Sequence, residues 1–466
     1  MSIREKIYKI ILSLGAIATI LVLLFPKDNM PNLFLLPLTY FITSIFVKGF
    51  YKRSLGVAII VIEISRLCRL IILPLLICVE TSFNGTDACP QYHGLAIELI
   101  AYEMLCVGVV LWFVSKRLKP FRYSAKASNN SFGFLSKMVV VLWFYYALTI
   151  PQYRDKLLNF SVQFLDVDEL TSITTSSWNN LIFVSGIIFV YCYFFKFAIK
   201  LKGVHKIIAI IFISILYLSS VWTSGATVSR WSAITALMVI INTSVYYFYN
   251  KRKSILSVGI VCVLFIVLIG SLFKSFSTGH SDYTLGDSTK LYFSSQMMDE
   301  YFQGVRCVSQ GIAVVLKYKT VTDFGYFLHD WLNSVPYLCN LIGISDYPFT
   351  ELLYRNFFKR EELICPTLTA SATVFGFIGA PIYSCLAAYF SFILEQRFWK
   401  ATNIICKNLY LVSTFWLSLF YAVNPPIIQL HLWPMLICTL FVYIENKMKF
   451  FKKKNETKNI SNNNLL

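Results

Sequence analysis

Arg230 follows a short polar turn between two long apolar runs. The turn reads TSGATVSR from Thr223 to Arg230, and an apolar run that predicts a helix begins directly after it. A guanidinium offers several N–H donors in one plane, and the amides at a helix N-terminus add positive potential. Together they would bind a phosphate group. The alternative is an arginine whose side chain simply extends to the phosphate headgroups of membrane lipids.

A second set of polar residues lies among aromatic residues in the segment 274–368. Transfer of a sugar from a lipid pyrophosphate would need cations that neutralise the leaving group and a base for the acceptor hydroxyl. The cations that suit the first role are Arg230, Arg306 and Arg355. The residues that suit the second role are His329 and Asp330, with His280 in reserve. Taken singly, each of these loop residues could equally be a solvated surface charge, or half of a local salt bridge such as Glu351 with Arg355.

Charged residues also occur inside apolar runs. Glu63, Arg66 and Arg69 recur at three-residue spacing, and Glu98 and Glu103 lie in the next run. A charge at this depth of a membrane costs roughly 2.5 to 3.5 kcal/mol, so these groups should face other helices and pair. The first interpretation is an ion-pair network that locks the third and fourth helices together. The second is a pathway for protons or ions.

The composition predicts a membrane protein. The chain is 57% hydrophobic and 14% charged, against about 45 to 50% and about 25% in soluble domains. The net charge of +18 comes from short basic clusters between apolar runs, a pattern that indicates membrane topology rather than nucleic-acid binding. The 12 cysteines show no metal-ligand spacing, so no metal site is expected. A disulfide among Cys78, Cys89, Cys307, Cys339 and Cys365 is the alternative to buried thiols.

The elements that must position these residues are membrane helices. A bilayer core of about 30 Å needs roughly 20 mainly apolar residues per helix, and the sequence predicts about twelve transmembrane helices in an all-α fold. Basic residues collect in every second connection, which places both termini in the cytoplasm. The predicted helices are 7–25, 32–47, 55–79, 94–115, 134–151, 178–198, 206–222, 231–249, 254–273, 369–394, 408–424 and 427–446.

Residues 1–446 are expected to form one transmembrane domain, interrupted by a large extracytoplasmic loop at 274–368. Phe324, Phe327, Leu328, Trp331 and Leu332 recur at helical spacing in this loop, which predicts short amphipathic helices on the outer leaflet. Gly376, Gly379 and Pro381 mark the tenth helix as a close packing seam or a groove for a lipid tail. Residues 447–466 are basic and rich in asparagine, and are expected to be a disordered cytoplasmic tail.

Three segments resemble the Wzy-type O-antigen and capsular repeat-unit polymerases. They are the SGATVSR turn, the loop segment FLHDWLNSVPYL and the closing segment TLTASATVFGFIGAPIYSCLAAYF. The resemblance implies a GT-C-like glycosyltransferase of the bacterial cytoplasmic (inner) membrane. It implies transfer between undecaprenyl-pyrophosphate-linked oligosaccharides, without a nucleotide sugar, a metal or another cofactor. Of the site residues, the family motif carries over only Arg230, and Ala226 to Val228 lengthen the usual spacing of that motif.

The partners implied are the lipid-linked oligosaccharides and membrane lipids, with a chain-length regulator and a flippase as candidate protein partners and no nucleic acid. Two rival functions are a ligase of the same class, which would transfer the finished glycan to a lipid core, and a flippase for lipid-linked oligosaccharides. The charges of the third helix favour the flippase. The long loop and the lack of an internal sequence repeat favour the polymerase.

Overall fold

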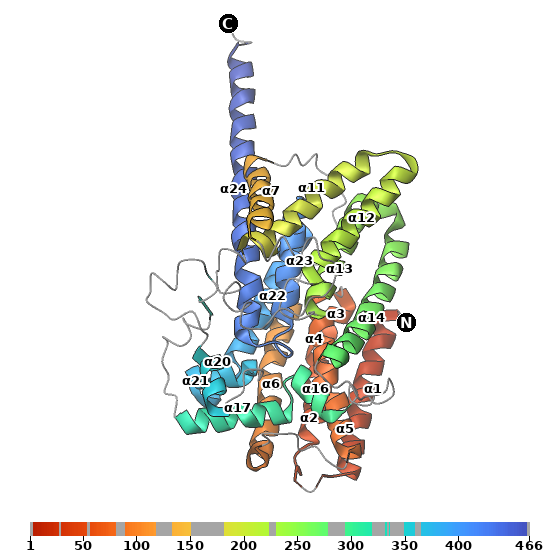
Figure 1. Ribbon diagram of the computed structural model, residues 1–466. Helices are drawn as coiled ribbons and strands as arrows, with labels where there is room; N and C mark the ends of the chain where they lie inside the picture. Colours follow the sequence, from red (N-terminus) through yellow and green to blue (C-terminus); the bar gives the residue numbers. More distant parts are fainter. Residues whose placement is uncertain are drawn as a thin grey trace. The chain divides into compact units, whose positions relative to one another are not determined.

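The computed structural model describes residues 3–27, 29–53, 56–80, 89–117, 133–150, 181–222, 230–277, 294–318, 331–332, 335, 349–358 and 365–463. This part of the chain is almost entirely helical and contains no β-strand (Figure 1). It divides into two compact units. Unit 1 comprises residues 1–122, 275–396 and 414–430, and unit 2 comprises residues 123–274, 397–413 and 431–466.

Unit 1 contains the first helices of the chain and those of the long connection, residues 274–368. Its helices are α1 (Ile3–Leu24), α2 (Leu35–Phe46), α3 (Lys48–Arg53), α4 (Val57–Leu67), α5 (Leu73–Val79), α6 (His93–Arg117), α16 (Ser295–Tyr301), α17 (Val305–Tyr318), α20 (Phe349–Phe358), α21 (Thr367–Gly379) and most of α22 (Ile382–Lys400). A π-helical turn, η1 (Cys68–Ile72), joins α4 to α5, and a 3₁₀ turn, η2 (Pro90–Tyr92), precedes α6.

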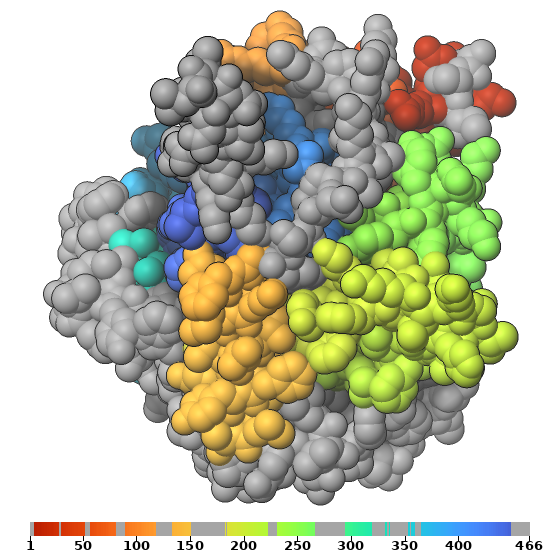
Figure 2. All heavy atoms as spheres, turned by 90° about the horizontal axis from the view of Figure 1, so that it is seen from above, coloured from red at the N-terminus to blue at the C-terminus, as the bar shows by residue number. Residues whose placement is uncertain are grey.

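Unit 2 contains α7 (Phe134–Thr149), the π-helical turn η3 (Leu181–Ser185), α11 (Gly186–Lys200), α12 (Gly203–Trp222), α13 (Arg230–Tyr247), the 3₁₀ turn η4 (Tyr249–Lys251) and most of α14 (Arg252–Ser277). The last two helices, α23 (Ile404–Ser418) and α24 (Pro425–Asn463), have residues in both units. In the space-filling view of Figure 2, α7 lies beside α11, and α11 in turn packs against α12. The surface of α12 is apolar, with exposed Ile207, Ile208, Ile211, Phe212 and Ile215.

The π-helical turn η1 has a local cause. Pro74 follows it by two residues, and proline has no N–H to donate to the carbonyl four residues earlier. Its ring also crowds that carbonyl, so the helix widens before the proline. The third predicted run, 55–79, is therefore built from α4, η1 and α5, and Arg69 lies inside the widened turn.

The described part of the long connection contains three short helices, α16, α17 and α20. Helix α17 runs across the direction of α6 (Figure 1) and contacts α6, α20 and α21. Every residue from Val305 to Val315 is buried, so α17 is a packed part of unit 1 rather than a helix with one face in water. Residues 324–328, which carry much of the predicted amphipathic pattern, lie outside the described residues.

The number of transmembrane helices is supported only in part. Helices occupy all twelve predicted runs, but among the described residues four are long and apolar enough to cross a membrane. They are Arg4–Leu24, Pro90–Arg117, Gly203–Val221 and Pro425–Met448, and two bent pairs raise the number to six if each pair is one span. These apolar helices indicate a membrane protein. The count of twelve stays a prediction.

The tenth predicted helix is broken. The chain bends by 110° between α21 and α22. Gly376 within α21 has φ 71° and ψ 176°. That backbone conformation is almost exclusive to glycine. From the sequence we expected one continuous helix here, with a close packing seam or a groove for a lipid tail. In the structure, Gly376 interrupts that helix.

The expectation of a disordered tail is wrong for most of its length. Helix α24 continues to Asn463. No proline or glycine occurs between Pro434 and Asn463, so nothing in the backbone interrupts a helix that has already been nucleated by the preceding apolar segment.

Candidate functional site

The structure describes the predicted site residues unevenly. His329 and Asp330, the predicted catalytic pair, lie outside the described residues, as does His280. Arg230 is the first residue of α13 and Arg355 lies on α20, but neither side chain is among those described. Arg306 is the one predicted pyrophosphate-binding residue whose side chain can be followed.

Arg306 lies near the start of α17 and is only 3% exposed. Its guanidinium pairs with the carboxylate of Glu300, and its backbone N–H donates to Asp299 Oδ2 at 2.9 Å. Cys307 N–H donates to Asp299 Oδ1, also at 2.9 Å. Asp299 therefore caps α17. The positive charge of Arg306 already has a carboxylate partner, so a phosphate would have to share this guanidinium with Glu300.

Burial has the largest effect on the pKa values of Asp299 and Cys307. It raises the pKa of the Asp299 carboxyl, while Arg306 and the two backbone donors act to lower it. Burial also raises the pKa of the Cys307 thiol well above its ordinary value. Because a thiol must lose its proton to attack, Cys307 is not suited to act as a nucleophile at neutral pH.

A buried polar cluster of unit 1 brings the long connection to the membrane helices. We call it the Arg69 centre, and its members are Arg69, Glu103, Gln303, Thr367 and Ser384. Arg69 Nη1 donates to Glu103 Oε2 of α6 at 2.7 Å, and Arg69 Nε donates to the backbone oxygen of Gln303 at 3.0 Å. The guanidinium carbon lies 5.0 Å from the centre of the Tyr421 ring. Arg69 and Glu103 are each 1% exposed.

The remaining members extend the Arg69 centre to the broken helix. Ser384 of α22 donates to the second oxygen of Glu103. Gln303 Oε1 accepts from the backbone N–H of Thr367, the first residue of α21, at 2.9 Å. Thr367 Oγ1 in turn donates to the carbonyl of Val423 at 3.1 Å. One connected set of hydrogen bonds therefore joins η1, α6, the turn between α16 and α17, and both halves of the broken helix.

The turn that carries Gln303 is tightly built. Gln303 has φ 49°, a left-handed conformation that is uncommon outside glycine. A Cβ on Gly304 would lie 2.3 Å from Leu73 Cδ2 and 2.5 Å from Asp299 Oδ2. The close approach to α5 and the cap of α17 together impose this conformation, which turns the Gln303 carbonyl toward Arg69.

A second ion pair lies one helical turn earlier. Arg66 Nη1 pairs with Glu63 Oε2 at 2.9 Å, and Arg66 Nη2 donates to Thr43 Oγ1 at 2.5 Å. Tyr40 donates to the other Glu63 oxygen at 2.7 Å. The pairing expected from the sequence is therefore confirmed for both arginines, and the Arg69–Glu103 pair joins the third and fourth predicted helices. Glu98 is different, since it accepts from Asn32 in an exposed position.

In the two ion pairs every carboxylate oxygen accepts a hydrogen bond, whereas some of the nearby N–H groups have no acceptor in the part of the chain that the structure describes. Both oxygens of Glu63 and both oxygens of Glu103 accept hydrogen bonds. Among the described residues, no acceptor forms a hydrogen bond with Arg66 Nε, Arg69 Nη2 or Gln303 Nε2. A buried donor without a partner costs about 1 to 3 kcal/mol. Chemically, these N–H groups suit an oxygen-bearing ligand.

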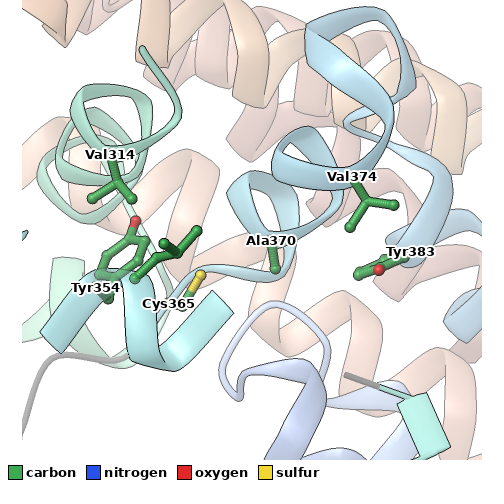
Figure 3. Close-up of a cluster of buried hydrophobic side chains, with 7 residues drawn as sticks. Val314, Tyr354, Cys365, Ala370, Val374 and Tyr383 are labelled. Carbon is green, nitrogen blue, oxygen red and sulfur yellow. The ribbon is translucent and has the colours of Figure 1, made fainter. Parts of the chain in front are cut away.

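An apolar cluster packs the long connection onto the broken helix. Its buried members are Val314, Leu353, Tyr354, Cys365, Ala370, Val374 and Tyr383 (Figure 3). Trp331 packs against the cluster, with its ring edge-on to Tyr383 and the centroids 5.3 Å apart. Trp331 belongs to the segment FLHDWLNSVPYL, so this contact fixes one residue of the resembling segment against α22.

The described cysteines and acidic residues offer no other centre. The eleven cysteines among them form no disulfide with one another, and Cys339 lies outside the described residues. Within the same residues, no three of the His, Cys, Asp and Glu side chains gather as a metal site would require.

Sequence reasoning found Arg69 and Glu103 but missed Gln303, Thr367 and Ser384. An uncharged residue in a long connection gives no signal of its own. The nearest clue was the glycine that follows Gln303, which marks a tight turn before a helix.

Comparison of the chain with known protein families, with curated proteins and with solved structures finds no match.

Proposed function

We propose that this chain is a membrane-embedded glycosyltransferase that polymerises undecaprenyl-pyrophosphate-linked oligosaccharide repeat units on the outer face of the bacterial cytoplasmic membrane. The observation that carries the proposal is the Arg69 centre. It joins the long connection, which holds the predicted catalytic residues, to apolar helices that suit a lipid substrate. In the same centre, Gln303 Nε2 could donate to a phosphate or sugar oxygen.

The proposed reaction is a single glycosyl transfer. A hydroxyl of the acceptor repeat unit attacks the anomeric carbon of the donor glycan, and a new glycosidic bond forms there. The bond from that carbon to the pyrophosphate oxygen breaks, and undecaprenyl pyrophosphate leaves with the electron pair. The hydroxyl proton passes to a base, for which His329 and Asp330 are the candidates. Arg230, Arg306 and Arg355 would neutralise the departing pyrophosphate.

Helix packing would supply much of the rate. Holding donor and acceptor in line converts an encounter of two lipids into a reaction within one complex. The Trp331–Tyr383 contact supports this role for the long connection, because it packs Trp331 against α22. His329 and Asp330 are the two residues before Trp331.

The proposal is tested by deleting the gene in its host and separating the surface polysaccharide by gel electrophoresis. Loss of the ladder, leaving one repeat unit on its lipid, is the expected result. Loss of all attached glycan would instead point to a ligase or a flippase. An unchanged ladder would refute the proposal.

A flippase for lipid-linked oligosaccharides is the second candidate. The buried ion pairs of Arg66 and Arg69 favour it, since charged residues inside membrane helices often mark transport pathways. Purified protein in liposomes separates the two functions. With lipid-linked repeat units already accessible, a polymerase lengthens the glycan without any transport, whereas a flippase moves single units across the bilayer and lengthens none.

A further inference from the structure

Besides its ion pair with Glu103, Arg69 makes contacts with other parts of unit 1. Its Nε donates to the carbonyl of Gln303, which lies 234 residues later in the chain. Gln303 in turn accepts from the first amide of α21, and Glu103 accepts from Ser384 of α22. One side chain is therefore linked by hydrogen bonds to the α16–α17 turn and, through Gln303, to the start of the broken helix.

We propose that Arg69 is a positioning residue, which holds the turn between α16 and α17 and the start of α21 against the membrane helices α5 and α6. The effect of Arg69 on catalysis rests on the proposed function, because that turn begins the part of the long connection that leads to the predicted catalytic residues. The contacts of Arg69 do not rest on the proposed function.

The shape of the arginine side chain suits this role. A guanidinium donates from several nitrogens in one plane and offers a flat face to an aromatic ring. Arg69 uses Nη1 for Glu103, Nε for Gln303 and its face for Tyr421. A lysine ammonium could keep the charge pair with Glu103, but it is a compact group on a flexible stem and lacks the fixed fork needed for all three contacts.

Arg66 provides a matched control within the same helical region. It is equally buried, at 0% exposed against 1% for Arg69, and it also pairs with a glutamate. Its other contacts are with Thr43 and the Tyr40 ring of α2. The hydrogen bonds and ring contact found for Arg66 do not reach the long connection. Replacing Arg66 should therefore disturb burial and charge to the same degree without releasing the α16–α17 turn.

The π-helical turn explains how the two arginines come to differ. Arg66 is in the last turn of α4, whereas Arg69 lies inside η1. A π-helical turn has more residues per turn than an α-helix, so Arg69 does not keep the regular α-helical position relative to Arg66. Such turns occur often at functional sites, and here the turn directs one of two similar arginines to a different partner.

The experiment is amide hydrogen exchange followed by mass spectrometry on the full-length protein in detergent or nanodiscs. We expect Arg69→Lys to speed exchange about tenfold or more in peptides covering 294–318, the loss expected when a hydrogen bond to a charged donor is removed. Arg66→Lys should leave these peptides at the wild-type rate. Equal protection of 294–318 in the two variants would overturn the proposal.

A second variant keeps the test decisive if Arg69→Lys does not fold. Arg69→Gln with Glu103→Gln removes both charges together, so no unpaired charge stays buried. Fast exchange confined to 294–318 and the start of α21 supports positioning. Exchange that rises across all of α1 to α6 indicates that Arg69 only stabilises the fold, and would overturn the proposal.

Steady-state kinetics then tests the catalytic consequence. With polymerisation as the assay, Arg69→Lys should lower kcat about tenfold or more at an unchanged KM, because the mispositioned group acts in the transition state. Wild-type kcat alongside faster exchange would overturn the catalytic part. If neither the wild type nor any variant polymerises, the exchange result still decides the positioning role, and only the proposed function fails.

Discussion

Gly311 shows how closely α17 approaches its neighbours. A Cβ at this position would lie 2.2 Å from Tyr354 Oη and 2.3 Å from Thr369 Oγ1. These two oxygens lie 3.2 Å apart and share a hydrogen bond. The absence of a side chain therefore lets α17 pack directly against α20 and α21, where the apolar cluster of Figure 3 forms.

We expect Gly311→Ala to lower the free energy of unfolding by about 1 to 3 kcal/mol, the usual cost of adding a methyl group to a packed interior. Thermal unfolding in detergent, followed by tryptophan fluorescence, measures the loss. Gly94→Ala in α6 is the control, because no atom of the described residues lies within 4 Å of a Cβ built there. A Gly311→Ala protein as stable as the control would show that α17 can move away.

Arg230 is the residue on which the resemblance depends most directly. We expect Arg230→Lys to lower polymerisation by about a hundredfold, because a lost donor to a developing oxyanion costs that much. Incorporation of labelled repeat units into polymer is the measurement. Arg252→Lys is the control, since Arg252 is exposed at the start of α14 and contacts Tyr249. Normal polymerisation by a correctly inserted Arg230→Lys protein would remove Arg230 from the site.

At the scale of elements, the break between α21 and α22 is built from both sequence and tertiary contacts. Gly376 supplies a backbone conformation that other residues avoid. Ser371 Oγ then donates to the carbonyl of Gly379 at 3.0 Å and accepts from the N–H of Tyr383 at 3.4 Å. These bonds satisfy backbone groups that the break leaves without helical partners.

The break predicts a backbone effect that is separable from packing. Gly376→Ala should destabilise the protein by about 1 to 3 kcal/mol, the cost of placing a Cβ in this region of φ and ψ. In the part of the chain that the structure describes, no atom lies within 4 Å of the added Cβ, so the loss would come from the backbone. Thermal unfolding against Gly94→Ala is again the comparison. An unchanged melting temperature would mean that α21 can continue as a regular helix through residue 376.

At the scale of the whole molecule, the apolar surface and the basic clusters decide how the chain sits in a membrane. Exposed apolar side chains cover α12, as they do much of α1 and α14. In water these faces would cost free energy in proportion to their area, whereas lipid tails accept them. Among the described residues, four helices are long and apolar enough to span a bilayer, and the number is six if each of the two bent pairs is one span.

Reporter fusions test the predicted topology. Alkaline phosphatase, which is active only outside the cytoplasm, should be active when joined after Lys319 in the long connection. A fluorescent protein joined after Leu466 should fluoresce, because the C-terminus is predicted to be cytoplasmic. An inactive phosphatase after Lys319, or a dark fluorescent protein after Leu466, would contradict the alternation of basic connections on which the topology rests.

The sequence by itself determined the helical class, the apolar character and the approximate place of the twelve apolar runs, because these depend on composition and periodicity within one segment. It also determined that Arg66, Arg69 and Glu103 must pair, since an isolated charge inside an apolar helix is too costly to keep. It misjudged the tail after Lys447, where helix propagation continued past the apolar residues.

The tertiary structure alone decided which partner each charge takes. Arg66 and Arg69 are the same residue type in the same run, yet only Arg69 reaches Gln303, 234 residues away. That contact depends on the widened turn η1, on the left-handed conformation of Gln303 and on the close approach allowed by Gly304. Such distant geometric conditions leave no periodic trace in a single sequence, because periodicity reports only the environment of one element.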